Sequence, residues 1–341
     1  MNTSQRKNDH IHYVLDDRVD NRRYSNEFDT IQLEYQSLPE IDFASVDTSI
    51  ELHGKKLFAP IIIGSMTGGT EKAKVLNQRL AKAAEICQIG MALGSQRIQI
   101  ENHSCENHFS VKLGAPNLPF LFANIGAVQL NYGVSNADLQ YIVESVNADA
   151  LFFHTNPLQE TLQTEGNTNF SELIKKIEEI VTCFEVPIFL KDIGCGISES
   201  FARKIAHLSI SGIEVAGLGG TSWAIIESLR SPESIESLGE TFRFFGISTV
   251  QSLKNCQKHL KSKTIIASGG LRNGLDVAKA IILQADLAAF ARPFLLAAEI
   301  STDAVVDRIQ RIIRELKIAM FCLGISNINE LKKMKIFNRG M

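Results

Sequence analysis

The sequence predicts an α/β protein, a (β/α)8 TIM barrel (residues 58–341) that follows an N-terminal extension (residues 1–57). From residue 58 onward, short apolar segments alternate with segments of helical periodicity, a pattern typical of parallel sheets. The apolar segments number eight, as a closed barrel of this class requires, and a chain of 341 residues falls within its usual length. A doubly wound sheet is the alternative, but no G-x-G-x-x-G motif follows the first strand.

The elements of the barrel follow in chain order. Each expected strand is a short apolar run that ends in polar residues or glycine; the runs are residues 60–63, 91–93, 120–123, 150–153, 188–190, 213–216, 265–267 and 287–290. Apolar residues at helical spacing predict helices at residues 71–86, 138–146, 170–183, 199–208, 249–259 and 274–284. Residues 222–246 are longer than a simple connection and predict an extra helix or a lid.

Composition excludes several classes of protein. The 35 basic and 38 acidic side chains give a net charge of −3, so no electrostatic argument favours nucleic acid as a partner. The sequence contains no apolar run of about 18 residues and no apolar core of a signal peptide near its start, which predicts a cytoplasmic protein without a membrane partner. The six cysteines form no C-x-x-C pair and indicate neither disulfides nor a structural zinc site.

The residues that follow the strands share one property: they carry polar groups or glycine at the edge where barrel active sites lie. This set comprises Thr67, Ser95, Gln96, Arg97, Asn124, residues 154–160, Lys191, Thr221, Gly269, Gly270, Ala291 and Arg292. We therefore expect one large polar ligand to be held on this rim. A barrel that binds without catalysing is an alternative, which so complete a polar set argues against.

The last two strand ends predict a phosphate site. Gly269 and Gly270 follow the seventh strand, and Ala291, Arg292 and Pro293 follow the eighth. Glycines let backbone N–H groups approach an anion, and a helix N-terminus adds partial positive charge. Barrels of this class often bind phosphate after strands seven and eight. A tight turn without a ligand is the alternative interpretation of the two glycines.

Three further segments carry reactive groups. Lys191 follows a strand directly and is a structural lysine, a cation beside a flavin, or a Schiff-base lysine. The loop 154–160 combines the imidazole of His154, the amide of Gln159 and the carboxylate of Glu160, and such a carboxylate beside a diphosphate often holds Mg²⁺. Cys195 lacks a neighbouring histidine and is expected to be inert.

The N-terminal segment contains cations and histidines close together, in residues 6–12. A solvated tail is the ordinary interpretation of such a segment. The functional interpretation is that it folds over the active site and brings Arg6, Lys7 and His10 to a diphosphate.

Taken together, these loops resemble the type 2 isopentenyl-diphosphate isomerases, which are FMN-dependent (β/α)8 barrels. The resemblance extends from residue 6 to the last barrel helix, and its most specific motifs are RKNDHI (6–11) and HTNPLQE (154–160). The supporting motifs are MTGG (66–69), GSQR (94–97), GGTSW (219–223), SGGLR (268–272) and ARPF (291–294). The SGG and ARPF motifs also occur in other FMN barrels, including the 2-hydroxy-acid oxidases.

The resemblance implies roles for residues at the matching positions. It implies FMN contacts at Met66, Thr67, Gly68, Ser95, Asn124, Lys191, Thr221, Gly269, Gly270, Ala291 and Arg292. It implies substrate contacts at Arg6, Lys7, His10, Ser95, Gln96, Arg97, His154 and Gln159, with Mg²⁺ on Glu160. His154, Gln159 and Lys191 are the catalytic candidates.

The implied reaction is a 1,3-allylic proton shift that interconverts isopentenyl and dimethylallyl diphosphate, in isoprenoid precursor biosynthesis. Reduced FMN would act as acid and base, with NAD(P)H as its reductant. The family also implies a homo-oligomer, a tetramer or octamer. An FMN-dependent 2-hydroxy-acid oxidase or dehydrogenase is the alternative enzyme, but after Gly269 and Gly270 the only nearby cation is Arg272 and no histidine follows.

Overall fold

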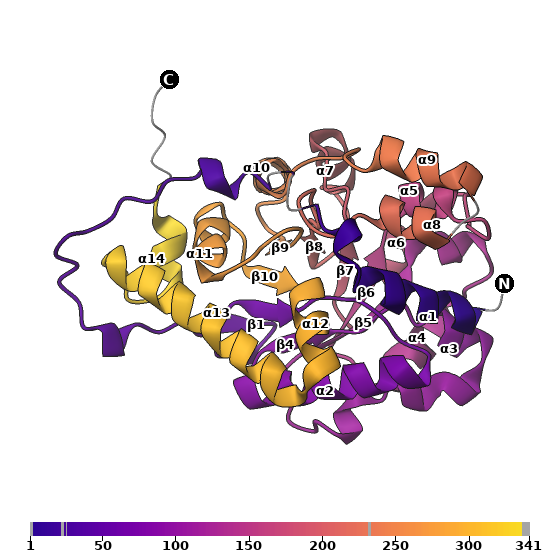
Figure 1. The fold of residues 1–341 in the computed structure, drawn as a ribbon, viewed down its shortest axis with the longest axis horizontal. Helices are drawn as coiled ribbons and strands as arrows, with labels where there is room; N and C mark the ends of the chain where they lie inside the picture. Colours follow the sequence, from indigo (N-terminus) through magenta and orange to yellow (C-terminus); the bar gives the residue numbers. More distant parts are fainter. Residues whose placement is uncertain (1–2, 22–23, 25, 231–232, 336–341) are drawn as a thin grey trace.

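The centre of the molecule is a closed barrel of eight parallel strands (Figure 1). The computed structural model describes the chain except for residues 1–2, 22–23, 25, 231–232 and 336–341. Each barrel strand pairs with the next along the chain, and β10 closes the barrel on β3. The strands are β3 (Ile61–Ile63), β4 (Gly90–Ala92), β5 (Leu121–Gly126), β6 (Ala150–His154), β7 (Ile188–Lys191), β8 (Gly212–Glu214), β9 (Thr264–Ala267) and β10 (Leu287–Phe290). The predicted TIM barrel is confirmed.

Aromatic side chains fill one end of the barrel. Phe122 and Phe152 stack with their ring centroids 4.4 Å apart, and Phe189 meets Phe122 edge-on at 5.2 Å. An antiparallel hairpin, β1 (Ile50–Leu52) and β2 (Lys55–Leu57), packs against the residues that begin the strands. His53 in its turn lies 5.7 Å from the Phe189 ring. The hairpin therefore closes the amino end of the barrel, and the carboxyl end is left for a ligand.

Helices cover the outside of the barrel. Six of them occupy the predicted segments: α2 (Glu71–Cys87), α4 (Asn136–Glu144), α6 (Leu173–Val181), α7 (Glu199–Ile205), α10 (Thr249–His259) and α11 (Gly274–Ile282). Local sequence fixes their ends; the hydroxyl of Thr70, for example, accepts a hydrogen bond from the Ala73 N–H at the start of α2. The long predicted connection holds α8 (Trp223–Arg230) and α9 (Glu233–Phe242). Five more helices follow the N-terminal extension: α3 (Arg97–Glu101), α5 (Pro157–Leu162), α12 (Arg292–Ile300), α13 (Thr302–Cys322) and α14 (Ile328–Lys333).

The N-terminal extension crosses the whole molecule. It begins with α1 (Thr3–Val14), which packs beside α8 at the carboxyl end of the barrel (Figure 1). In the described part of the extension, three short 3-10 helices follow, at Asp17–Val19, Phe28–Thr30 and Phe43–Ser45. Backbone hydrogen bonds then tie the extension to the end of the chain: the Gln36 N–H donates to the Cys322 carbonyl at 2.9 Å. The extension thus contacts both the mouth of the barrel and its outer helices.

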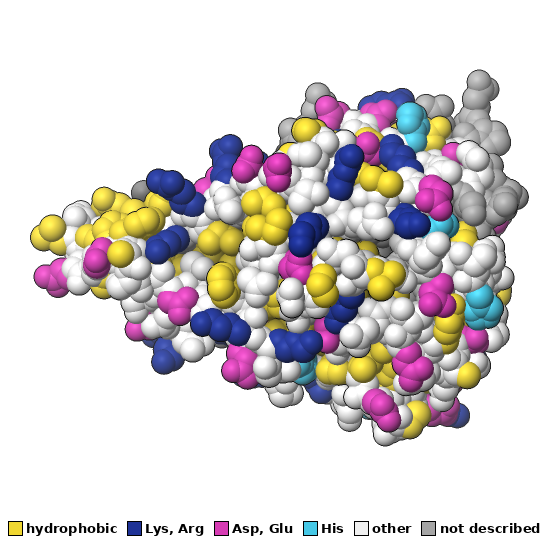
Figure 2. Space-filling model, turned by 90° about the horizontal axis from the view of Figure 1, so that it is seen from below, with side chains coloured by type: hydrophobic (Ala, Val, Ile, Leu, Met, Phe, Trp, Pro, Cys, Tyr) yellow, Lys and Arg dark blue, Asp and Glu magenta, His cyan; other side chains and the backbone are white. Residues whose placement is uncertain are grey.

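The surface carries charges of both signs. On the face seen in Figure 2, basic and acidic side chains are interspersed, and hydrophobic side chains gather at the narrow end of the molecule. Within the extension, Tyr35 is 68% and Leu38 82% exposed. Among the helices in the described part of the chain, none has the length and apolar character needed to cross a membrane.

Candidate active site

A cavity of about 490 Å³ lies at the carboxyl ends of the barrel strands, beneath α1. This volume is in the range of small-molecule and cofactor sites. Residues from strand ends all round the barrel line it, so one ligand can contact many loops at once. With two exceptions, the predicted site residues line this cavity: Arg6, Lys7, His10, Met66, Thr67, Ser95, Arg97, Asn124, His154, Gln159, Glu160, Lys191, Thr221, Gly269, Gly270, Ala291 and Arg292.

The exceptions are Gly68 and Gln96. A Cβ on Gly68 would lie 2.0 Å from the ring of Phe109, so this glycine leaves room for a packed aromatic behind the cavity. The Gln96 side chain is fully buried in the barrel wall. Its amide donates to the Ile142 carbonyl at 2.9 Å and accepts from the Asn124 N–H at 2.9 Å. The structure therefore gives Gln96 the position of a support for Asn124 rather than a contact to substrate.

His154, at the end of β6, is a neutral imidazole. Burial, and then the nearby charges of Lys191 and Lys7, lower its pKa to about 3. Its Nδ1 lies 2.8 Å from Oδ1 of Asn124, whose amide nitrogen donates to the Leu93 carbonyl. The asparagine oxygen must accept, so Nδ1 carries the proton and Nε2 is left as an acceptor.

A buried carboxylate joins the 154–160 loop to α1. Glu227 on α8 is fully buried; its Oε1 accepts from Gln159 Nε2 at 2.8 Å and lies 2.9 Å from His10 Nε2. Arg230 pairs with its other oxygen. These opposite charges and hydrogen bonds keep the pKa of Glu227 below its usual value although burial alone would raise it. Glu227 therefore fixes the amide of Gln159 at the cavity wall.

Sequence reasoning did not single out Glu227. Its signal was present, because a carboxylate stands at the end of the apolar run Ala224–Ile225–Ile226 directly after the GGTSW motif. A charged residue on a buried helix face needs a partner, and only the fold shows that the partners come from α1 and α5.

The α1 helix contributes cations to the cavity. Lys7 is buried, and its ammonium donates to the Ser95 carbonyl at 2.8 Å. Burial, and then the charge of Arg6, lower the pKa of Lys7 to about 7. Burial and the charge of Arg97 also lower the pKa of Arg6. Arg6, Lys7 and Arg97 thus form a cationic group whose mutual repulsion a bound anion would reduce.

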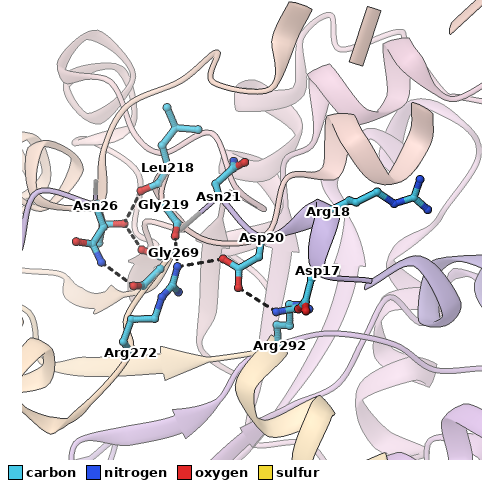
Figure 3. A network of polar contacts seen from close by, with 12 residues as sticks. Asp17, Arg18, Asp20, Asn21, Asn26, Leu218, Gly219, Gly269, Arg272 and Arg292 are labelled. Carbon is cyan, nitrogen blue, oxygen red and sulfur yellow. Dashed lines mark hydrogen bonds and ion pairs between the residues drawn. The ribbon is translucent and has the colours of Figure 1, made fainter. Parts of the chain in front are cut away.

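A second cationic group lies at the predicted phosphate cradle. Gly269 has φ +97°, and a Cβ there would lie 2.0 Å from the Gly217 carbonyl oxygen. Only glycine fits this approach of two backbones. Asp20 of the extension lies between Arg272, at 3.2 Å, and Arg292, at 2.9 Å (Figure 3). A phosphate bound here would compete with this carboxylate for both arginines.

The donor set of the cavity fits FMN. Its glycine turns and Arg292 can bind a phosphate. The ammonium of Lys191 can stabilise the negative charge that a flavin ring gains when it is reduced. Three lining side chains, Ser65, Asn156 and Glu214, keep a buried oxygen without a hydrogen-bond partner among the described residues. Such atoms are costly unless a ligand satisfies them.

The cavity offers fewer groups for Mg²⁺ than for FMN. Within the residues that the structure describes, no three His, Cys, Asp or Glu side chains converge as metal ligands. Glu160 lines the cavity and accepts from Asn156 Nδ2 at 2.9 Å. One carboxylate suits a Mg²⁺ ion that keeps its waters and takes further oxygens from a bound diphosphate.

Comparison with known proteins supports the assignment. Residues 128–338 match the model of the FMN-dependent dehydrogenase family. Proteins named isopentenyl-diphosphate delta-isomerase are similar over almost their whole length. That of Rickettsia bellii is 44% identical over 97% of this chain and 97% of its own, and that of Hydrogenovibrio crunogenus is 42% identical over 96% of both.

Solved structures share the fold. A flavocytochrome b2 variant with bound sulfite has a TM-score of 0.70 at 21% identity, covering 95% of this chain and 81% of its own. A mandelate oxidase mutant with (S)-mandelic acid has a TM-score of 0.67 at 16% identity, covering 99% and 97%. These identities establish the barrel alone, whereas the isomerase sequences match at 42–44% identity over 96–97% of this chain. The chain belongs to the FMN-dependent, type 2 isopentenyl-diphosphate delta-isomerase family.

Proposed function

We propose that this enzyme interconverts isopentenyl and dimethylallyl diphosphate by a 1,3-allylic proton shift that depends on reduced FMN and Mg²⁺. The observation that carries the proposal is the presence of two separate cationic groups on one cavity. Arg272 and Arg292 flank the glycine cradle, and Arg6, Lys7 and Arg97 surround the α1 side. Two anion sites suit the phosphate of a cofactor and the diphosphate of a substrate.

FMN, reduced by NAD(P)H, would supply the acid and base for the alkene. The chain's own residues would bind and orient. Arg6, Lys7 and Arg97, with Mg²⁺ on Glu160, would hold the diphosphate, whose binding energy orients the small apolar tail. Lys191 would place a fixed cation beside the flavin.

The neutral state of His154 limits its role. With a pKa of about 3 the imidazole carries no charge at neutral pH, so it contributes an acceptor at Nε2 rather than a cation for phosphate. Gln159, held by the Glu227 carboxylate at 2.8 Å, would position the substrate tail without adding charge of its own. Burial raises the pKa of the Cys195 thiol to about 12, consistent with an inert cysteine.

The test is conversion of isopentenyl diphosphate by purified protein under anaerobic conditions, with FMN and Mg²⁺, with and without NADPH or dithionite. We expect dimethylallyl diphosphate only when reductant is present, and no turnover after chelation of Mg²⁺. Bound, reducible FMN without turnover would overturn the proposed reaction and direct the search to 2-hydroxy acids.

A further inference from the structure

A carboxylate at the centre of the barrel has no role in the chemistry above. Glu214 on β8 stands opposite Lys191 on β7 in the parallel register. Both side chains are 5% exposed, and Lys191 Nζ lies 3.6 Å from Glu214 Oε1. Both residues line the cavity. The cation that would face the flavin is thus paired with a buried anion.

Glu214 is held from its other side by Ser268, the residue that follows β9. The hydroxyl of Ser268 donates to Glu214 Oε1 at 2.8 Å and accepts from the Ala216 N–H at 3.0 Å. The second carboxylate oxygen, Oε2, is buried without a partner among the described residues. A buried carboxylate oxygen in this state is costly and calls for a hydrogen-bond donor from a ligand.

We propose that Glu214 is a positioning residue for Lys191: it attracts and partly neutralises the ammonium, which donates its hydrogen bond to the Asp192 carbonyl at 2.7 Å, and it accepts through Oε2 a hydrogen bond from the bound flavin. The inference rests on FMN binding in this cavity as proposed above. A flavin offers donors of the required kind, an N–H on its pyrimidine ring and the hydroxyls of its ribityl chain. Glu214 would therefore tune the flavin through the net charge of the pair.

The electrostatic consequence has a definite sign. Two opposite charges at this distance, away from water, cancel much of each other's field. Removing Glu214 exposes the charge of Lys191, which favours the more negative, reduced flavin. Removing Lys191 exposes the charge of Glu214, which disfavours it. A purely structural role for Glu214 predicts no such reversal between the two variants.

The experiment measures the two-electron midpoint potential of bound FMN by anaerobic titration. Glu214→Gln should shift the potential upward by the equivalent of about a tenfold preference for the reduced form, and Lys191→Gln should shift it downward. The double variant Lys191→Gln/Glu214→Gln should lie near the wild type, because both members of the neutral pair are gone. Shifts of both single variants in one direction, or no shift with Glu214→Gln, would overturn the proposal.

Controls separate charge from packing. Glu178→Gln makes the same charge change at a side chain that is 51% exposed and should leave the potential unchanged. Ser268→Ala removes a hydrogen bond to Glu214 but no charge, and should shift the potential less than Glu214→Gln. If Glu214→Gln does not fold, Glu214→Asp replaces it, because the shorter side chain places the carboxylate farther from Lys191. The proposal requires a small upward shift of the midpoint potential, and a downward shift overturns it.

The outcomes also separate this inference from the function on which it rests. A wild-type protein that binds FMN but does not isomerise overturns the proposed reaction alone, since the potentials can still be compared. A protein that binds no FMN overturns both.

Discussion

Lys7 is the residue whose charge depends most directly on a bound anion. Its pKa is about 7 because burial and Arg6 both oppose its charge. A diphosphate beside it adds negative charge and raises that pKa, so we expect proton uptake on binding above pH 7 and weaker binding as the pH rises. Calorimetry with inorganic diphosphate and Mg²⁺ at pH 8, in buffers of different ionisation enthalpy, measures this uptake.

The matched variants for that measurement are Lys7→Met and Lys261→Met. The first should abolish most of the uptake, and the second, at an exposed lysine, should leave it intact. Binding without buffer dependence in the wild-type protein would show that Lys7 does not face the anion.

Substitution of Gln159 tests whether the 154–160 loop contributes to turnover. Replacing it with leucine removes the donor to Glu227 and the amide at the cavity wall, while the flavin cradle is untouched. Loss of a hydrogen bond to a charged group costs about 1.5–3 kcal/mol, so we expect kcat to fall about 10-fold to 160-fold with FMN absorbance retained. Gln140→Leu, on the exposed side of α4, serves as the control. Loss of flavin in Gln159→Leu, with normal kcat per bound flavin, would mean that the loop has been misassigned.

At the scale of elements, substitution of Gly269 tests whether the turn between β9 and α11 binds the phosphate. Alanine there combines a left-handed backbone, φ +97°, with a Cβ 2.0 Å from the Gly217 carbonyl oxygen. Gly133 has a similar φ, +93°, and open space around it. Gly133→Ala therefore carries only the conformational cost, roughly 1 kcal/mol, whereas Gly269→Ala must also move backbone at the phosphate cradle.

We expect Gly269→Ala to weaken FMN binding at least tenfold, measured by flavin fluorescence titration, with Gly133→Ala indistinguishable from wild type. Equal FMN affinity in the two variants would show that this turn does not hold the phosphate.

The strands could be predicted because each is an apolar run cut off by polar rim residues, as at Leu190 and Lys191. The α1 helix could not be predicted in the same way. Its sequence is polar almost throughout, and its anchors are tertiary contacts, such as Lys7 to Ser95 and His10 to Glu227. Local sequence does not encode partners that lie more than 80 positions away.

At the scale of the whole molecule, the barrel topology brings the eight strand ends to one rim. The shared location of the strand-end candidates could therefore be predicted from the sequence, whereas their roles were implied by the family resemblance. Three acidic residues in and around the cavity escaped that reasoning. Glu214 and Glu227 are buried carboxylates whose partners lie on other elements, and Asp20 reaches the cradle only through the path of the extension. Gln96, the residue before α3, turns its side chain into the barrel wall towards Ile142 and Asn124, and motif position does not reveal this orientation.

The buried neutral His154 links the site to the stability of the entire fold. In the unfolded chain an imidazole has a pKa of about 6.5, and in the folded protein its pKa is about 3. Between these values the unfolded state binds the additional proton, so the free energy of unfolding falls as the pH falls, by about 1.4 kcal/mol per pH unit from this group. Asp192 acts in the opposite direction, because burial raises its pKa to about 6 and the folded state takes up that proton first.

Comparison of variants isolates the contribution of His154. Between pH 7 and pH 5 the wild-type protein should lose about 2 kcal/mol more stability than His154→Gln, as measured by urea unfolding at both pH values. His207→Gln removes a histidine that is 56% exposed and should retain the wild-type dependence on pH. If His154→Gln kept the full acid sensitivity of the wild type, the imidazole would be charged in the folded protein. The assignment of Nε2 as a free acceptor at the cavity would then be wrong, because a protonated ring has none.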